Sequence, residues 1–183
     1  WAGPWLRDVA GYDRGQIANT LLVATFALVV SGPLGGYVAT LLRRVGVATM
    51  TFAVACMFVF LLVQVGLFLE MTRFTGTLWL LFGLFGPLSL MTYAALNQTF
   101  PKTVAGRVNT SMTLMWMMGA FAVQTGMGVI IDQFPTTASG GYAAQGYGTS
   151  FSVLIALQVA AFLWYGIAGF VWRDHLVASR KSA

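Results

Sequence analysis

The sequence predicts an all-α polytopic membrane protein with five transmembrane helices. Three observations indicate this fold class. First, 58% of the 183 residues are hydrophobic, and the mean hydropathy is +0.78. Second, charged residues make up only 8% of the chain, whereas a soluble domain carries about 25%. Third, the few charges leave uncharged stretches longer than the roughly 20 residues that a helix needs to cross a bilayer.

The chain is expected to form one membrane domain over residues 1–183. Residues 1–16 begin with WAGPWLRDVAG, which is typical of a helix end followed by a loop, here on the outer side. We therefore expect the sequence to be a piece of a longer protein. Five spans are expected next, at 17–42, 46–68, 77–99, 106–131 and 150–172. Residues 173–183 are expected to form a cytoplasmic tail.

Charged residues define each of these spans. The first four spans lie between pairs of charges that enclose 24 to 28 uncharged positions: Arg14 and Arg43, Arg44 and Glu70, Arg73 and Lys102, and Arg107 and Asp132. The fifth follows a connector rich in Gly, Tyr and Thr and extends from Phe151 to Trp172. All five are apolar on every side, so they lack the alternation that marks the strands of a membrane barrel.

The loops form two groups, because consecutive helices end on alternate sides of the membrane. One group contains seven basic residues: Arg43, Arg44, Lys102, Arg107, Arg173, Arg180 and Lys181. The other contains three basic residues and four of the five acidic residues. The positive-inside rule places the first group in the cytoplasm. We therefore expect an integral protein of the lipid bilayer, in the bacterial inner (plasma) membrane, with a cytoplasmic C-terminus.

The same composition argues against other classes of protein. The net charge of +5 comes from isolated basic residues and pairs, not from the stripe that a nucleic-acid surface needs. A membrane-embedded enzyme needs clustered His, Asp or Glu, or a nucleophile beside a base, and the sequence shows neither. No spacing of metal ligands is present around the single cysteine, Cys56. We therefore expect no enzyme, metal site or cofactor.

Three stretches together resemble a known family. FPKTVAGRVNTSMTLMWMMGAFAVQTGMGVIIDQFP, residues 100–135, resembles the region from the tenth to the eleventh helix of the major facilitator superfamily. WAGPWLRDVAGYDRGQ resembles the outer end of the seventh helix and its loop. GGYVATLLRRVG resembles the family's cytoplasmic loop motif G-x-x-x-D-R-x-G-R-R, which Gly36, Arg43 and Arg44 fit. Thr40 stands in place of the aspartate and Leu41 in place of the first basic residue, so the motif's charge relay is incomplete here.

The resemblance implies that these are the last five of twelve helices, a partial six-helix C-terminal bundle. Such proteins are secondary transporters or facilitators that move a small solute by alternating access. The implied partners are the missing N-terminal half and a small-molecule substrate. The resemblance also implies that the first, fourth and fifth helices of this half line or flank the central cavity. The first, third and fourth spans here correspond to the second, fourth and fifth of those six helices. Gln64 and Gln158 lie on the second and fifth spans, outside that cavity, and are expected to join helices.

Neutral polar residues in the spans are the candidates for substrate contact. Phe82, Gly86, Ser89, Tyr93 and Asn97 recur at intervals of three or four, which predicts one helix face. The predicted substrate-binding residues are Ser89, Tyr93, Asn97, Thr113, Trp116 and Gln124. The alternative is that such side chains only bond to a neighbouring helix. No acidic or basic residue lies between the bracketing charges, so a proton-coupling group is expected elsewhere.

Small residues and proline indicate close packing or bending. The predicted hinge and packing positions are Gly32, Gly36, Gly86, Pro87, Gly126 and Gly128. Gly32 and Gly36 form a G-x-x-x-G pattern, which permits close approach of helices. A second narrow stripe of small residues lies on the same span: Thr20, Ala27, Ser31 and Gly35. The alternative to a transporter is a non-transporting membrane module, or a truncated half that packs with a partner half.

Overall fold

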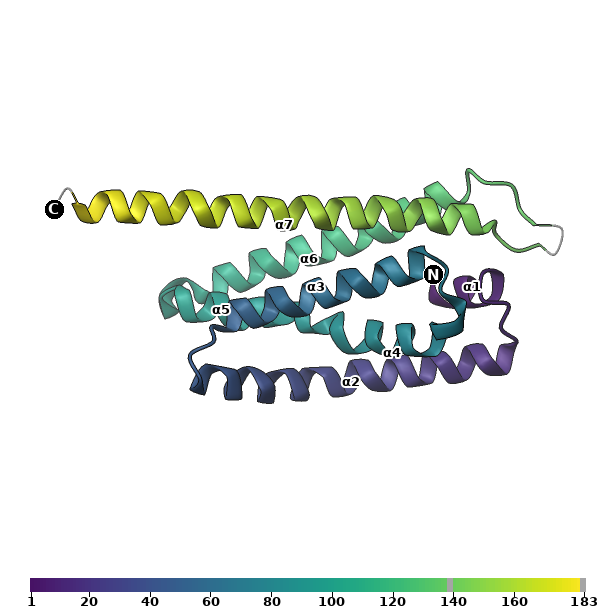
Figure 1. Cartoon of the computed structure of the whole chain (residues 1–183), viewed down its shortest axis with the longest axis horizontal. Coiled ribbons are helices and arrows are strands. Elements are labelled where there is room, and N and C mark those ends of the chain that lie inside the picture. Colours follow the sequence, from purple (N-terminus) through teal and green to yellow (C-terminus); the bar gives the residue numbers. More distant parts are fainter. Residues whose placement is uncertain (138–139, 182–183) are drawn as a thin grey trace.

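The computed structural model describes residues 1–137 and 140–181, with the side chains of all of these except residue 99 and residues 170–181. Its elements run nearly parallel to one long axis (Figure 1). The α-helices are α1 (Ala2–Asp8), α2 (Arg14–Arg44), α3 (Thr49–Phe68), α4 (Thr75–Phe85), α5 (Met91–Thr99), α6 (Lys102–Ile131) and α7 (Ala144–Lys181). Two 3₁₀ turns join them, η1 (Thr72–Phe74) and η2 (Pro87–Leu90).

Five helical units are long and apolar enough to cross a membrane: α2, α3, the unit 72–98, α6 and the part of α7 up to Gly169. This confirms the predicted fold class. The expected spans 17–42 and 106–131 lie inside α2 and α6. Helix α3 begins at Thr49 rather than at 46, and α7 extends from Ala144 to Lys181 rather than over 150–172.

Local sequence explains where the helices begin and end. At the start of α2, the Asp13 side chain accepts a hydrogen bond from the Gln16 backbone N–H at 2.8 Å. The Gln16 side chain accepts one from the Asp13 N–H at 3.0 Å, which completes a capping box. Pro101 precedes α6 as its N-cap. The chain therefore reverses direction between α5 and α6, as the sequence predicts.

Small residues set the spacing between α2 and α4. The buried residues of α2 are Thr20, Ala27, Ser31, Gly35 and Ala39, so the predicted small-residue stripe is confirmed as the packing face. A Cβ atom built on Gly83 of α4 would overlap the backbone oxygen of Ala24. A Cβ on Gly32 or Gly36 would meet no atom of the described chain within 4 Å, so the close helix approach expected at these two glycines stays a prediction. Each directly follows a residue of the stripe, about 100° further around α2.

A hydrophobic core joins α1 to the ends of four other helices. Its fully or nearly fully buried members are Trp5, Leu6, Leu67, Trp79, Ile131, Tyr147 and Phe151. The Trp5 and Trp79 rings meet edge to face, with centroids 5.8 Å apart, a favoured aromatic geometry. This core holds the short α1 in place between α2 and α7.

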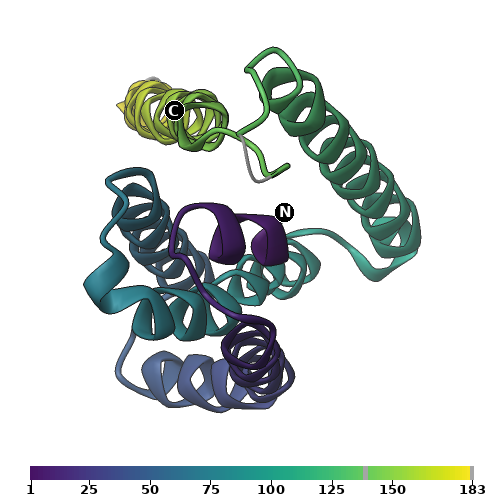
Figure 2. The same ribbon diagram turned by 90° about the vertical axis from the view of Figure 1, so that its right-hand side faces the viewer.

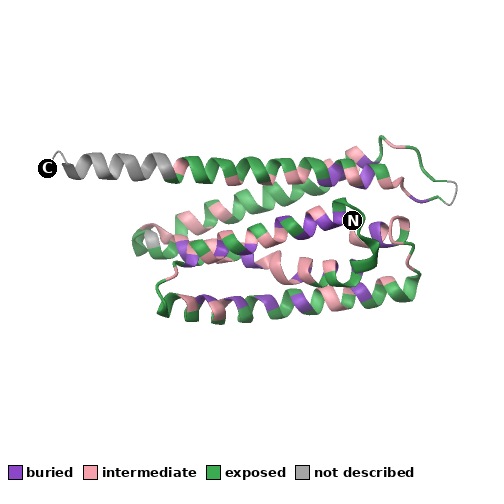
Figure 3. Ribbon diagram, in the orientation of Figure 1, coloured by how far each residue is buried: buried purple, intermediate pink, exposed green. Residues whose placement is uncertain are grey.

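The loops gather at two opposite ends of the molecule (Figure 1). One end contains the α2–α3 and α5–α6 junctions and the end of α7, and the other contains α1, the α3–α4 junction and the loop before α7. This agrees with the two loop groups that the sequence predicts. Burial is uneven between the helices (Figure 3). In an apolar stretch of 18 residues taken from each span, 39% of the residues are buried in α3 but only 6% in α6 and in α7.

Candidate functional site

The third span is interrupted in the middle of the bundle. Helix α4 ends at Phe85, the 3₁₀ turn η2 follows, and α5 begins at Met91. Pro87 opens the turn and has no N–H to donate. Local hydroxyls bond to backbone oxygens here: Ser89 Oγ donates to the Gly86 carbonyl at 2.9 Å, and Thr92 Oγ1 donates to the Ser89 carbonyl at 2.8 Å.

This interruption corrects the prediction of one continuous helix face. A 3₁₀ turn has 3.0 residues per turn instead of 3.6, so the residues after it are rotated relative to those before it. Phe82, Gly86 and Ser89 line cavities beside α3 and α7. Tyr93 instead contacts α6. Phe82, Gly86 and Ser89 therefore face the cavities, whereas the Tyr93 hydroxyl bonds to Thr113 of α6.

Tyr93 and Thr113, two of the predicted substrate-binding residues, do meet. The Tyr93 hydroxyl donates to Thr113 Oγ1 at 3.2 Å, which joins α5 to α6. Thr113 Oγ1 in turn donates to the Asn109 carbonyl at 2.9 Å. The side-chain oxygen of Asn109 is buried and has no hydrogen-bond partner among the described residues. This cluster therefore offers one unused acceptor beside two hydroxyls.

The other predicted substrate-binding residues do not join this cluster. Asn97 and Gln124 are exposed, and Trp116 is 57% exposed on α6. At Gln124 the backbone is the contact, since its carbonyl accepts a hydrogen bond from the Trp1 indole at 3.2 Å. A Cβ on Gly128 would lie 3.1 Å from the Trp1 ring, whereas Gly126 has open space around it. Gly128 thus permits close packing of Trp1 on α6.

Two adjoining cavities lie between α3, α4 and α7, with volumes of about 320 and 520 Å³. We call them together the central groove. Its wall on α3 consists of Met50, Val54, Met57, Phe60 and Gln64. Its wall on α7 includes Phe151, Leu154, Gln158, Ala161 and Tyr165. The second and fifth spans, which the resemblance places outside the transport cavity, therefore line this groove.

Gln64 and Gln158 form the main polar feature of the groove. Gln64 Nε2 donates to Gln158 Oε1 at 3.1 Å, and Gln158 Nε2 donates to Gln64 Oε1 at 2.9 Å. The pair links α3 to α7, which confirms the predicted helix-to-helix bond. Each amide satisfies the other, as buried polar groups in an apolar setting require.

Asp8 forms a polar centre that the sequence analysis missed. Its side chain is 5% exposed and pairs with Arg7 at 2.6 Å. It also accepts hydrogen bonds from the Tyr142 N–H at 3.0 Å and the Tyr147 hydroxyl at 2.9 Å. Burial alone would raise the pKa of Asp8, but the hydrogen bonds and the Arg7 charge lower it below its usual range. Nothing local in the sequence links Asp8 to partners more than 130 residues away.

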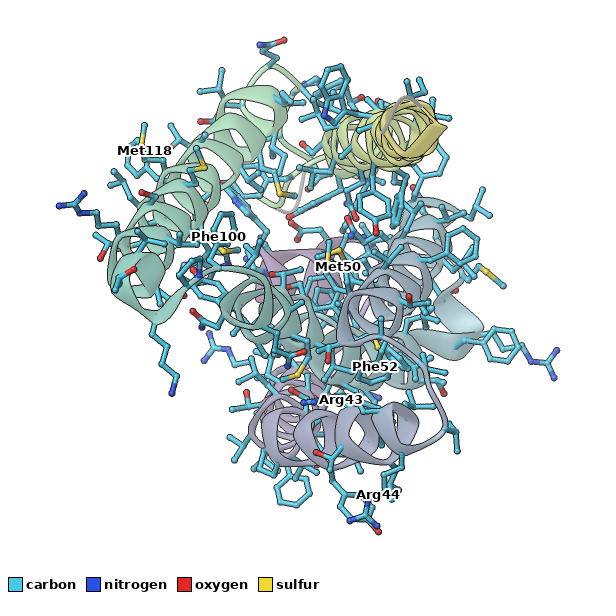
Figure 4. All side chains as sticks on the ribbon, turned by 90° about the vertical axis from the view of Figure 1, so that its left-hand side faces the viewer. Arg43, Arg44, Met50, Phe52, Phe100 and Met118 are labelled. Carbon is cyan, nitrogen blue, oxygen red and sulfur yellow. The ribbon has the colours of Figure 1, made fainter. Side chains whose placement is uncertain are left out.

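The basic residues predicted to fix the topology lie at one end of the bundle. Arg43, Arg44, Lys102 and Arg107 are exposed, and Arg44 points away from the other helices (Figure 4). Thr40, which stands where the motif has an aspartate, donates to the Gly36 carbonyl at 2.8 Å. Thr40 therefore bonds within its own helix and leaves the arginines without a carboxylate partner in the described chain.

These features define an integral membrane protein with an interrupted span beside an apolar groove. In the part of the chain that the structure describes, no three His, Cys, Asp or Glu side chains come together as metal ligands would. Comparison with protein-family models, with curated proteins and with solved structures finds no match to the chain.

Proposed function

We propose that the chain is part of a secondary transporter or facilitator that moves a small solute across the membrane by alternating access. The observation that carries this proposal is the interruption of the third span by η2 (Pro87–Leu90). Irregular backbone inside a membrane is tolerated only where it is buried in protein or lines a cavity. Interrupted helices near the middle of the bilayer are typical of transporter binding sites.

The sequence resemblance supports the same proposal and makes it more specific. The matching stretches imply the C-terminal half of a major facilitator superfamily transporter, with an N-terminal half as partner. The positive-inside rule would then place the end with Arg43, Arg44 and Lys102 in the cytoplasm. The bacterial inner membrane and a cytoplasmic C-terminus remain part of the proposal.

The α5–α6 cluster is the place that best fits a substrate contact. Tyr93 and Thr113 present hydroxyls, and Asn109 presents a side-chain oxygen with no partner in the described chain. A neutral solute could exchange its own hydrogen bonds for those of the cluster without placing a charge in the bilayer. We therefore propose an uncharged or amphipathic substrate. Ser89, Asn97, Trp116 and Gln124 stay candidates for other stages of the transport cycle.

A second candidate is a membrane module that does not transport but packs with a partner half. The exposure of α6 favours it, because large apolar side chains face outward along its length. Met118, for example, is 63% exposed and points away from the bundle (Figure 4). Lipid can cover such a surface, and so can another helical bundle. A transport assay distinguishes the two functions.

The test is uptake or efflux by the full-length protein against a panel of compounds, with Pro87→Ala and Pro33→Ala as a matched pair. Pro33 lies inside the uninterrupted α2, so it controls for a general effect of losing proline. Pro87→Ala should slow transport more than it lowers expression, because it allows the interrupted span to become a continuous helix. Equal loss of transport and expression would contradict the proposed role of the interruption. Failure to move any compound would favour the non-transporting module.

A further inference from the structure

The hydroxyl groups of Tyr93 and Thr113 have no proton left to donate. Thr113 Oγ1 gives its single proton to the Asn109 backbone carbonyl at 2.9 Å, and a carbonyl can only accept. The contact between the two hydroxyls therefore has one possible direction, from Tyr93 to Thr113 Oγ1 at 3.2 Å. Both protons are used, so each hydroxyl keeps only lone pairs, which accept hydrogen bonds.

Other hydroxyls of the third and fourth spans have the same polarity. Ser89 Oγ donates to the Gly86 carbonyl at 2.9 Å, and Thr92 Oγ1 donates to the Ser89 carbonyl at 2.8 Å. Thr110 Oγ1 donates to the Gly106 carbonyl at 3.0 Å. Such bonds to the preceding turn are common for Ser and Thr inside helices. A ligand beside these hydroxyls therefore meets acceptors rather than donors.

Asn109 adds an acceptor that has no proton to bind. Its side-chain oxygen Oδ1 is buried and has no hydrogen-bond partner among the described residues, which costs free energy. Asn109 lies one turn before Thr113, so the two side chains share the face of α6 that meets α5. The last torsion of an asparagine side chain is broad, so the oxygen can turn toward the exposed edge at Thr113. The amide nitrogen can donate, so a hydroxyl or an amide group of a ligand would satisfy both ends of the side chain.

The α5–α6 cluster, which consists of Tyr93, Asn109 and Thr113, lies where a solute can reach it. Figure 2 shows α6 at one side of the molecule rather than in its middle. Thr113 is exposed and Tyr93 is half-buried. Along the helix axis, Thr113 lies about 5 Å from the midpoint of the 30-residue α6. Transporter binding sites are typically found near this depth in the membrane.

Charged ligands fit this cluster poorly. An anion would face the lone pairs of Tyr93, Thr113 and Asn109 Oδ1. A cation would find acceptors but no opposite charge, because α5 and α6 contain no Asp or Glu, and an uncompensated charge inside the membrane is strongly unfavourable. The remaining class of ligand is a neutral molecule that carries a proton on oxygen or nitrogen.

We propose that the α5–α6 cluster selects a neutral solute that donates a hydrogen bond from a hydroxyl or an amide N–H group, and that Asn109 Oδ1 is the acceptor that determines this specificity. The inference rests on the proposed function, because it takes the ligand to be the transported solute. It adds the direction of the hydrogen bond between solute and protein, and it assigns that bond to a residue outside the candidates predicted from the sequence.

Binding to the purified full-length protein in detergent tests the proposal without requiring transport. The probes are sugars, polyols and primary amides, each beside an analogue in which methyl groups replace the donated protons; benzamide and N,N-dimethylbenzamide are one such pair. Benzoate and benzylamine supply charged counterparts with the same ring. Asn109→Leu removes the acceptor and keeps a side chain of similar shape. Asn19→Leu makes the same change at an exposed position of α2 and is the matched control.

We expect at least one donor probe to bind, and its methylated analogue to bind more weakly by about tenfold or more. This preference should disappear in Asn109→Leu and persist in Asn19→Leu. Without ligand, Asn109→Leu should unfold at the temperature of the unmodified protein or above it, because the change breaks no bond to Oδ1.

The proposal would be overturned if no donor probe bound, if the methylated analogues bound equally well, or if benzoate or benzylamine bound more tightly. A lower unfolding temperature for Asn109→Leu would also overturn it, because Oδ1 would then already have a partner. A protein that prefers donor probes through Asn109 but moves no solute would keep this inference and contradict the proposed function. A protein that transports only an ion would keep the proposed function and overturn this inference.

Discussion

Gly83 shows how the absence of one side chain determines the distance between two helices. Its Cα lies so close to α2 that an added Cβ would overlap the Ala24 carbonyl oxygen. That neighbour is backbone, which cannot move aside as a flexible side chain would. The sequence analysis selected Gly86 and Pro87 in this stretch as hinge and packing positions, and did not select Gly83. The structure adds that Gly83 is a packing position.

Replacing Gly83 by alanine should therefore separate α2 from α4. We expect Gly83→Ala to destabilise the purified protein by about 1–3 kcal/mol, the usual cost of overpacking a close contact. Thermal unfolding in detergent measures the effect. Gly76→Ala is the matched control, since Gly76 lies on the same helix with no atom within 4 Å of an added Cβ. Equal unfolding temperatures for the two variants would mean that the close contact does not stabilise the bundle.

Asp8 connects segments that are far apart in the sequence. Its carboxylate holds the backbone of Tyr142 and the hydroxyl of Tyr147 next to α1. The sequence identified Asp8 only as one acidic residue of the outer group. Its role depends on how the loop before α7 folds back over α1, and a local pattern contains no information on that.

The charge of Asp8 should make stability depend on pH in a defined direction. The pKa of Asp8 is lower in the folded state than in the unfolded chain. Its contribution to the free energy of unfolding is therefore complete above the usual aspartate pKa of about 4. The contribution is lost as the pH falls through the lower folded value. At neutral pH, Asp8→Asn should cost about 1–3 kcal/mol through weakened hydrogen bonds to a charged group. In unfolding curves of both proteins from about pH 7 down to about pH 2, the stability gap should be constant above about pH 4 and narrow below it. A gap that stays constant over the whole range would contradict the assignment.

Two prolines within the spans have opposite effects on their helices. Helix α2 continues through Pro33, whereas α4 ends just before Gly86 and Pro87. The sequence predicted a bend at Pro87 but not a complete 3₁₀ turn. The turn depends on the Ser89 and Thr92 hydroxyls, which bond to the backbone locally. These contacts are visible only once the backbone path is known.

The candidate site was predicted in part. Tyr93 and Thr113 come together because the chain reverses at Pro101 and returns α6 along α5, and the position of that reversal was correctly predicted. Gln124 could not have joined them, since eleven helical residues separate it from Thr113, a rise of about 16 Å. Asn109 was not selected, although it lies one turn before Thr113 on the same helix.

The Gln64–Gln158 pair should stabilise the contact between α3 and α7 as a unit. Double-mutant cycles on membrane helices give about 0.6 kcal/mol for such bonds, and we expect a coupling of that size here. Either single change to leucine leaves one amide unpaired in an apolar groove. Gln64→Leu alone should therefore lower the free energy of unfolding by more than the subsequent addition of Gln158→Leu lowers it further. Unfolding of the four proteins in detergent measures the coupling. Additive effects of the two changes would show that the bond contributes nothing.

The helices of the molecule are packed unevenly. Helices α2, α3 and α4 pack closely, while α6 and α7 leave most of their surface uncovered (Figure 3). The number of spans could be predicted because it depends only on length and polarity. The arrangement could not, because each span is apolar on all sides and its pattern does not distinguish a face toward protein from a face toward lipid. The central groove was missed for this reason.

The most direct test is the sidedness of two loops, since every proposal above depends on five membrane crossings. Cys56, the single cysteine, is buried and is replaced by alanine. One new cysteine then replaces Val45, between α2 and α3, or Thr136, in the loop before α7; both positions are exposed. A membrane-impermeant maleimide on intact cells should label Thr136→Cys, and should label Val45→Cys only after the membrane is opened. Labelling of both positions from one side would contradict the five-span arrangement, and the reverse pattern would contradict the proposed orientation.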